Sequence, residues 1–134
     1  MRRRNVFVDA TFVTVLLDPG SAEHDIATAL YDALTEEFVA GDTVLHSHAG
    51  MVEAVGDERA GDVMRICDVV PLRRYLLREA DRVVEQHPEL GLDRDRAVAL
   101  VIIRRERIGE VATFDPLYER LGVRTLPAGE AGVE

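Results

Sequence analysis

Asn5-Val6-Phe7-Val8-Asp9 is a short apolar run that ends in an acid. Its β-branched and aromatic residues predict a buried strand. Residues 43–46, 111–113 and 123–126 predict further strands, and residues 69–71 are short and extended. Between these runs apolar residues recur at helical spacing, so that strands alternate with helices along the chain. This order predicts a parallel sheet covered by helices on both faces.

The helices are expected from the same periodicity and from the residues that begin and end them. Ser21 and Ser47 are favourable N-cap residues, and Gly41 is a helix-ending residue. Cys67 falls within an apolar helical pattern, which favours a small buried hydrophobe over a nucleophile. The expected helices cover residues 11–17, 22–39, 48–55, 57–67, 72–84, 93–107 and 117–121.

Length and composition indicate one globular domain. The chain has 134 residues, of which 47% are hydrophobic, and it contains no internal repeat. We expect the domain over residues 1–127, followed by a small, acidic and frayed tail over residues 128–134. There is no apolar run long enough to span a bilayer and no signal peptide, which predicts a cytoplasmic protein without a membrane partner.

The charge of the chain restricts how it can bind nucleic acid. The net charge is −9, and every one of the 16 basic residues is arginine. Such an acidic surface is poor for binding RNA by bulk electrostatics, so a local arginine patch or metal ions would be needed. The runs Arg2-Arg3-Arg4, Arg73-Arg74 and Arg104-Arg105 can grip phosphates, although a solvated face is the commoner explanation for each.

Acidic residues follow the predicted strands at the edge where ligands gather in open parallel sheets. Asp9 ends the first strand, Asp115 follows the strand of residues 111–113, and Glu53 lies in the helix after the second strand. Asp93 or Asp95 begins another helix, where capping alone also favours acids. Clustered carboxylates repel one another, and a hard divalent ion such as Mg²⁺ or Mn²⁺ relieves the repulsion.

Neighbouring polar residues can support such a cluster. Thr11 and Thr113 are placed to orient the carboxylates or bound waters through hydrogen bonds. His46 and His48 flank the end of the second strand and could contact a phosphate or act as an acid, although loop histidines without a role are more common.

Three motifs, in order along residues 6–127, resemble those of PIN-domain proteins. Val6-Phe7-Val8-Asp9-Ala10-Thr11 is similar to their opening strand, Asp, small residue and Thr or Ser. Leu45-His46-Ser47 followed by Glu53 resembles their second strand, Ser and helical Glu. Ala112-Thr113-Phe114-Asp115-Pro116-Leu117-Tyr118 resembles their last acidic motif, with Leu121-Gly122-Val123 leading into a closing strand.

The resemblance implies a PIN-like three-layer α/β/α fold with a central, mostly parallel sheet of 4–5 strands. It implies a metal-dependent endoribonuclease that hydrolyses RNA phosphodiester bonds with Mg²⁺ or Mn²⁺, often as the toxin of a Vap-type toxin–antitoxin pair and often as a homodimer. The catalytic and metal-binding residues that it implies are Asp9, Glu53, Asp95 and Asp115, with Asp93 as the alternative third acid and Thr11, Ser47 and Thr113 in support.

The third acid is where this sequence departs from the family pattern. The family places Asp immediately before the Ala that corresponds to Ala97, and here Arg96 holds that position. Asp95 is one residue early and would need a shifted helix start to reach the cleft, while Asp93 can serve as the helix cap. We expect Asp95 to be the nearer third carboxylate.

Three functions are compatible with these residues. The first is an RNA-cleaving enzyme, either a toxin or an RNA-processing factor. The second is a degenerate PIN-like domain that binds RNA or a protein partner without cleaving, and the third acid discriminates between the two. A phosphatase or receiver domain is the third, but such proteins need paired early acids and a well-placed lysine, which this chain lacks.

Overall fold

A computed structural model describes residues 3–127 of the chain. Five parallel strands form one sheet in the order β3-β2-β1-β4-β5, so that the first strand lies in the middle. This confirms the α/β class and the predicted central sheet. The strands are β1 (Arg4–Val8), β2 (Thr43–His48), β3 (Cys67–Val70), β4 (Glu110–Ala112) and β5 (Arg124–Leu126).

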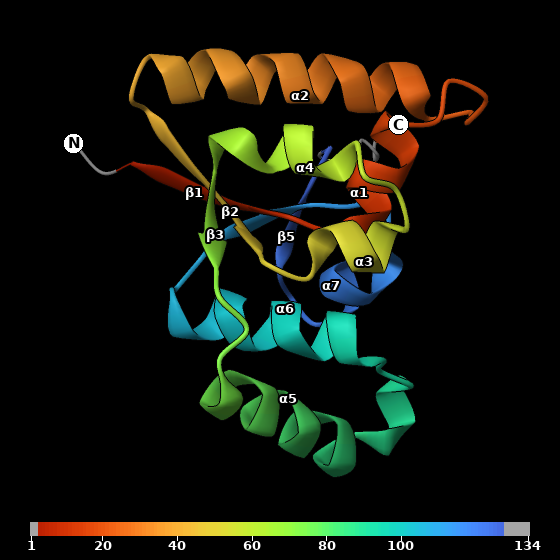
Figure 1. The fold of residues 1–134 in the computed structure, drawn as a ribbon, viewed down its shortest axis with the longest axis vertical. Coiled ribbons are helices and arrows are strands. Elements are labelled where there is room, and N and C mark those ends of the chain that lie inside the picture. Colours follow the sequence, from red (N-terminus) through yellow and green to blue (C-terminus); the bar gives the residue numbers. More distant parts are fainter. Residues whose placement is uncertain (1–2, 128–134) are drawn as a thin grey trace.

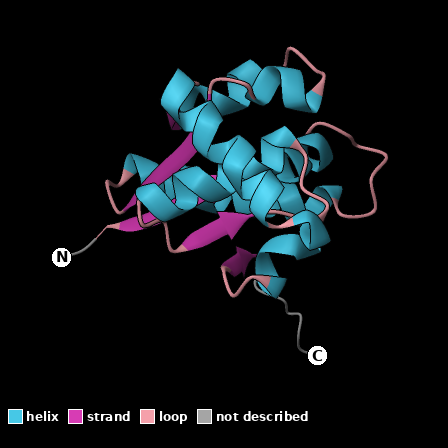
Figure 2. Cartoon of the chain, turned by 90° about the horizontal axis from the view of Figure 1, so that it is seen from below, coloured by secondary structure: helices cyan, strands magenta, loops and turns pink. Residues whose placement is uncertain are grey.

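Helices cover both faces of this sheet, as Figure 1 shows. The α1, α2 and α4 helices lie on one side, and α6 lies on the other with α5 packed outside it (Figure 1). Figure 2 views the same layers from below, with the strands behind the helices. The helices are α1 (Ala10–Leu16), α2 (His24–Val39), α3 (Met51–Val55), α4 (Ala60–Val63), α5 (Arg74–Gln86), α6 (Arg94–Arg105) and α7 (Pro116–Arg120), with 3₁₀ turns at Met64–Ile66 and Pro88–Leu90.

Alternation along β1 and β4 divides the core between the two faces, because successive strand residues point to opposite sides. Phe7 and Val111 pack with the helices α5, α6 and α7. Val6, Val8 and Ala112 pack with α1, α2 and α4 on the other side. β1 is therefore buried on both faces, as expected for the central strand of a parallel sheet.

The helix predicted over residues 57–67 is wrong in its length. Only the four residues of α4 are α-helical, and a 3₁₀ turn follows them. Cys67 then begins β3 and pairs with Leu45. The β-branched pair Val69-Val70 favours a strand, and pairing with β2 overrides the helical spacing of the preceding residues. Cys67 is thus a strand residue, not a helical one.

Neither predicted serine caps a helix. Ser47 lies within β2, fully buried, and its hydroxyl donates to the Val8 carbonyl at 3.4 Å. The following helix, α3, begins only after Gly50. The helix predicted from residue 22 begins at His24, because Ser21 forms a local turn in which its hydroxyl accepts from the Glu23 N–H.

Two further findings concern the whole chain. None of the helices within residues 3–127 has the length and apolar character needed to cross a membrane. The acidic tail predicted over residues 128–134 lies outside the described residues.

Candidate active site

Asp9 lies where β1 ends, and its side chain begins the next helix. One carboxylate oxygen, Oδ1, accepts the Phe12 N–H at 2.9 Å and thereby caps α1. The backbone N–H of Asp9 still donates to the Ala112 carbonyl of β4, so the residue is held against the neighbouring strand. Asp9 is only 3% exposed. The capping role, which the sequence did not suggest, explains why an acid can be fixed at the end of a buried strand.

Two threonines join Asp9 to the loop after β4. The Thr113 hydroxyl donates to Oδ2 of Asp9 at 2.7 Å, and the Thr11 hydroxyl donates to Oδ1 at 2.9 Å. The same hydroxyls accept backbone N–H groups, from Asp115 to Thr113 and from Phe114 to Thr11, each at 2.9 Å. Because every bond fixes both partners, the threonines orient Asp9 and the Asp115 loop as one unit.

Asp115 lies beside this unit and begins α7. Its Oδ1 accepts the Leu117 N–H at 3.0 Å, and its side chain is 4% exposed. Val8 of β1 pairs with Ala112 of β4, which places the residues after both strands next to each other. Two acids 106 positions apart in the sequence therefore meet at the carboxyl edge of the sheet, as predicted for parallel strands.

The environment changes the acidity of Asp9. Burial raises its pKa to about 6, and the charge of Asp115 adds to the increase. The hydrogen bonds from Thr113, the Phe12 N–H and Thr11 work in the opposite direction, because they stabilise the ionised carboxylate. A carboxyl group with a pKa of about 6 can exchange a proton near neutral pH.

The start of α6 supplies the third group of residues. Asp93 caps this helix by accepting the Arg96 N–H at 2.9 Å, as the sequence predicted. Asp95, in the first turn, accepts from Nε2 of His48 at 2.7 Å. Burial raises the pKa of Tyr118, and the charges of Asp9, Asp95 and Asp115 add to the increase.

His48 holds Asp95 from the end of β2. The Gly50 N–H points at Nδ1 of His48 at 3.0 Å, so this nitrogen is the acceptor and the proton resides on Nε2, which donates to Asp95. A Cβ at Gly50 would lie 3.2 Å from Nδ1 and 2.9 Å from Cδ1 of Leu72, so a larger residue would displace the Leu72 side chain and crowd the His48 ring. This pairing could not be predicted from a local pattern, because His48 and Asp95 are 47 positions apart in the sequence.

Two adjoining cavities are lined by these side chains. The first, of about 640 Å³, is lined by Asp9, Asp115, Asp93, Asp95 and Arg96 among others. The second, of about 290 Å³, is lined by Glu53 and His48, and it shares Ala54, Arg94 and Asp95 with the first. The structure thus brings Asp9, Asp95 and Asp115 to one cavity and places the exposed Glu53 in the neighbouring one.

Arg96 enters the first cavity at the position where the PIN pattern has its third acid. Its Nε lies 2.8 Å from Oδ2 of Asp115, and its side chain is 37% exposed. Because Asp115 is buried, this ion pair is only partly screened by solvent. The sequence marked Arg96 as a departure from the family pattern but did not predict its partner.

The arrangement does not fit a bound divalent ion. Oδ2 of Asp115 is already paired with the cation of Arg96 at 2.8 Å, and this positive charge repels a second cation at the same acid pair. Within residues 3–127 no three His, Cys, Asp or Glu side chains are grouped so that they could hold one metal ion. The Mg²⁺ or Mn²⁺ implied by the resemblance therefore stays a prediction.

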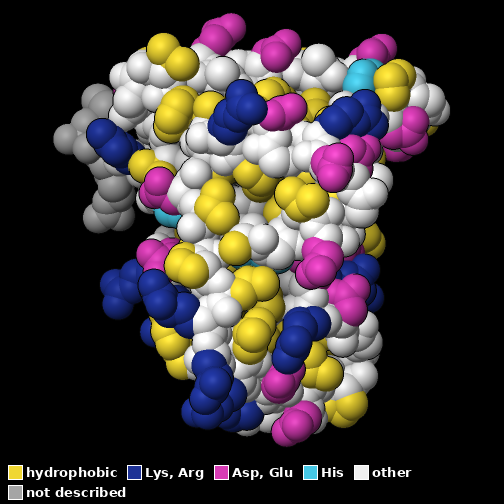
Figure 3. Space-filling view, viewed as in Figure 1, with side chains coloured by type: hydrophobic (Ala, Val, Ile, Leu, Met, Phe, Trp, Pro, Cys, Tyr) yellow, Lys and Arg dark blue, Asp and Glu magenta, His cyan; other side chains and the backbone are white. Residues whose placement is uncertain are grey.

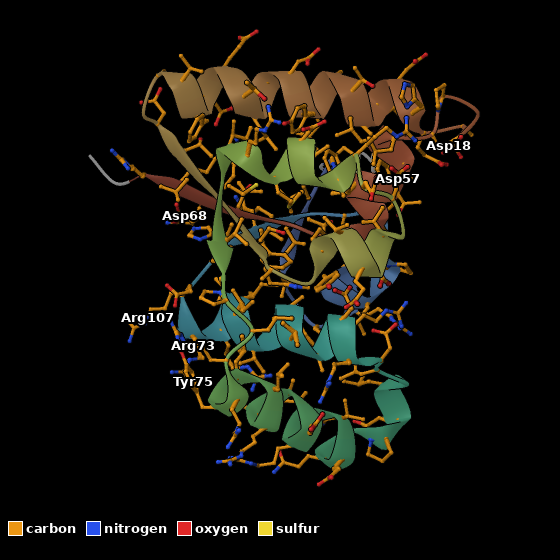
Figure 4. The ribbon with its side chains drawn as sticks, viewed as in Figure 1. Asp18, Asp57, Asp68, Arg73, Tyr75 and Arg107 are labelled. Atoms are coloured by element: carbon orange, nitrogen blue, oxygen red, sulfur yellow. The ribbon has the colours of Figure 1, made fainter. Side chains whose placement is uncertain are left out.

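The other arginine runs lie away from this cavity. Arg4 is bound to Glu37 and Glu110 at the opposite end of β1. Arg105 lies over the exposed ring of Tyr75 at 5.0 Å, at the far end of α6 from Asp95 and roughly 15 Å along the helix axis. Figure 4 labels Tyr75, Arg73 and Arg107 on this distant edge, and Figure 3 shows arginines gathered there.

The comparisons with known proteins agree with this fold. The solved structures include a similar one, VapC20 of Mycobacterium tuberculosis, described as a sarcin-ricin loop cleaving toxin. The two superpose with a TM-score of 0.73 at 18% sequence identity, over 88% of this chain and 95% of that chain. No protein-family model and no curated protein matches the sequence. At this identity the likeness shows the fold alone, and it confirms the predicted PIN-like fold.

Proposed function

We propose that this chain is an endoribonuclease that hydrolyses RNA phosphodiester bonds. The observation that carries the proposal is the buried pair Asp9 and Asp115, held side by side at the carboxyl ends of β1 and β4 and open to one cavity. The fold is shared with VapC20, whose description names it a sarcin-ricin loop cleaving toxin. Because fold alone does not determine function, the acid pair supports the proposal more strongly than the likeness does.

The side chains suit phosphodiester hydrolysis in two ways. Asp9, with its pKa of about 6, accepts a proton from the attacking water as the water oxygen bonds to phosphorus. The phosphorus bond to the leaving ribose oxygen breaks, and that oxygen takes a proton from solvent. The half-exposed Arg96 faces the same cavity and neutralises charge that develops on the phosphate.

The proposal extends to the partners that the resemblance implies. They are RNA as substrate, an antitoxin protein as inhibitor and a second copy of the chain in a homodimer, in a cytoplasmic setting where RNA is available. The helix α2 presents exposed apolar side chains, which supports a protein partner: Ile26, Phe38 and Val39.

Cleavage of structured RNA tests the proposal. The purified chain, Asp9→Asn and Asp115→Asn are incubated with ribosomal RNA in buffers that contain Mg²⁺, Mn²⁺ or EDTA, and the products are mapped by primer extension. We expect the chain to cut and both variants to be slower by about a hundredfold or more, because Asp9→Asn removes the proton acceptor and Asp115→Asn removes the carboxylate that positions Arg96. Asp62→Asn, an exposed acid on α4, is the matched control and should cut like the parent chain.

A second function, binding of RNA without cleavage, is favoured by one observation. The ion pair of Arg96 with Asp115 neutralises one of the two central acids, as expected for a site that has lost its metal chemistry. A folded chain that retains RNA on a filter but yields no cleavage in any of the three buffers rejects the ribonuclease and supports this second function.

A further inference from the structure

Arg96 is fixed in the candidate site by the start of its own helix. Asp93 caps α6 by accepting the Arg96 N–H, so Arg96 lies in the first turn at a defined rotation about the helix axis. From there its side chain reaches across the cavity to Oδ2 of Asp115 at 2.8 Å. The arginine is thus placed by the backbone as well as by its ion pair.

The carboxylates around it need a positive charge. Asp9 and Asp115 are buried next to each other, and like charges in that arrangement destabilise each other unless a cation lies between or beside them. Within residues 3–127 no triad of potential ligands could bring a metal ion to this place, whereas the guanidinium of Arg96 is already there. The cationic part of the site is therefore a side chain.

The guanidinium has further capacity for a ligand. It has five N–H donors in a planar fork that matches phosphate oxygens, and Asp115 is the partner that the structure gives it within the described residues. Its side chain is 37% exposed and lines a cavity of about 640 Å³. A phosphodiester that enters this cavity meets the unengaged N–H groups.

We propose that Arg96 is the resident cation of this site: held by Asp115, its guanidinium takes the place of a divalent ion and binds a phosphate of RNA. The inference rests on the proposed function in so far as RNA is the ligand. Beyond the proposed function, the inference predicts that RNA binds without metal and that Arg96 prevents a metal ion from binding. Both consequences are measured without any cleavage assay.

Metal binding is tested by calorimetric titration of Mn²⁺ into the chain, Arg96→Asp and Arg96→Ala. We expect Arg96→Asp to bind Mn²⁺ at least about tenfold more tightly than the parent chain, because removal of the guanidinium and addition of a carboxylate create an oxygen-ligand site. Arg120→Asp carries the same charge reversal on α7, where Arg120 lines neither cavity, and should bind Mn²⁺ as the parent chain does. Parent-chain binding as tight as that of Arg96→Asp overturns the proposal.

RNA binding is tested by fluorescence anisotropy of a short single-stranded RNA in EDTA. The parent chain should bind, Arg96→Ala should bind about tenfold more weakly, as for loss of one charge-assisted contact, and Arg120→Ala should match the parent. Arg96→Lys should lie between them, because lysine keeps the charge but not the fork. Equal affinity of Arg96→Ala and the parent overturns the phosphate role.

The outcomes separate this inference from the proposed function. A chain that binds RNA through Arg96 in EDTA, but cuts it in none of the Mg²⁺, Mn²⁺ and EDTA buffers, rejects the ribonuclease and leaves the inference standing. A chain that cuts RNA only with Mn²⁺ bound to the unaltered site rejects the inference and leaves the ribonuclease standing. Circular dichroism verifies folding of each variant, and Arg96→Ala replaces Arg96→Asp in the metal titration if the added acid prevents folding.

Discussion

At the scale of single residues, Asp9 combines burial with charge. Its pKa is raised from 3.8 to about 6 in the folded chain, so the folded state binds this proton more tightly than the unfolded state does. The stability associated with that proton is complete below about pH 4 and is lost as the pH rises through about 6. Above that pH the charged, buried carboxylate of Asp9 lowers the free energy of unfolding.

Asp9→Asn is therefore expected to stabilise the fold at pH 7.5, by up to roughly 3 kcal/mol, since each pKa unit corresponds to about 1.4 kcal/mol. Asparagine retains an oxygen that can accept the Phe12 N–H. The gain should shrink towards zero at pH 4. Urea unfolding at both pH values measures it, with Asp62→Asn as control. A gain of equal size at both pH values would assign the effect to something other than the charge.

Cys67 provides a second prediction at this scale. Burial raises the pKa of its thiol to about 12, so the reactive thiolate is scarce at neutral pH. We expect the native chain to react with a disulfide reagent at least about a hundredfold more slowly than the urea-unfolded chain. Comparable rates for the native and unfolded chains would show that the thiol is accessible and ionised.

Site residues were predictable where a local sequence pattern marks their position, and not where their role depends on a distant partner. Asp9 and Asp115 follow apolar strands directly, and parallel strands bring such positions together by a general rule. The partners of Arg96 and His48 could not be predicted, because an ion pair between α6 and α7 or between β2 and α6 depends on side-chain direction in the folded chain.

At the scale of elements, the first turn of α6 decides how the site is arranged. Asp93→Ala removes the cap and is expected to destabilise the fold by about 1 kcal/mol, whereas Asp93→Asn should change it by only a few tenths, since asparagine also caps well. Thermal unfolding of the two variants measures the difference. Equal losses would show that the charge of Asp93, and not its hydrogen bond to Arg96, stabilises the helix.

Most helices and strands were predictable from local patterns, including the short helices α1 and α7, whereas the segment before β3 was not. Each end of α2, α5 and α6 lies within two residues of its expected position. The segment before β3 was mistaken for a longer helix, because its apolar residues are spaced as on one face of a helix. Its true partner lies far away in the sequence: Cys67 of β3 pairs with Leu45 of β2, 22 positions earlier. Long-range pairing of that kind is not encoded in a local pattern.

At the scale of the whole molecule, the exposed apolar side chains of α2 offer a surface on which two copies of the chain could associate. Ile26, Phe38 and Val39 belong to α2, which forms the upper edge of the fold in Figure 1. We expect the chain to form a homodimer, and sedimentation equilibrium over a range of protein concentrations measures it. Replacement of Phe38 and Val39 by Ser should favour the monomer if α2 forms the interface. A parent chain that remains monomeric at the highest concentration contradicts the dimer.

The central place of β1 has a consequence for biosynthesis. Of the five strands β1 is made first and its neighbour β2 second, but its other neighbour, β4, is made only after β3 and the helices α5 and α6. Asp9 can therefore meet Asp115 only after the 105 residues between them have been synthesised. The growing chain therefore lacks the paired acids until residue 115 has been made, and the site that we propose for RNA cleavage is completed only after most of the fold has been synthesised.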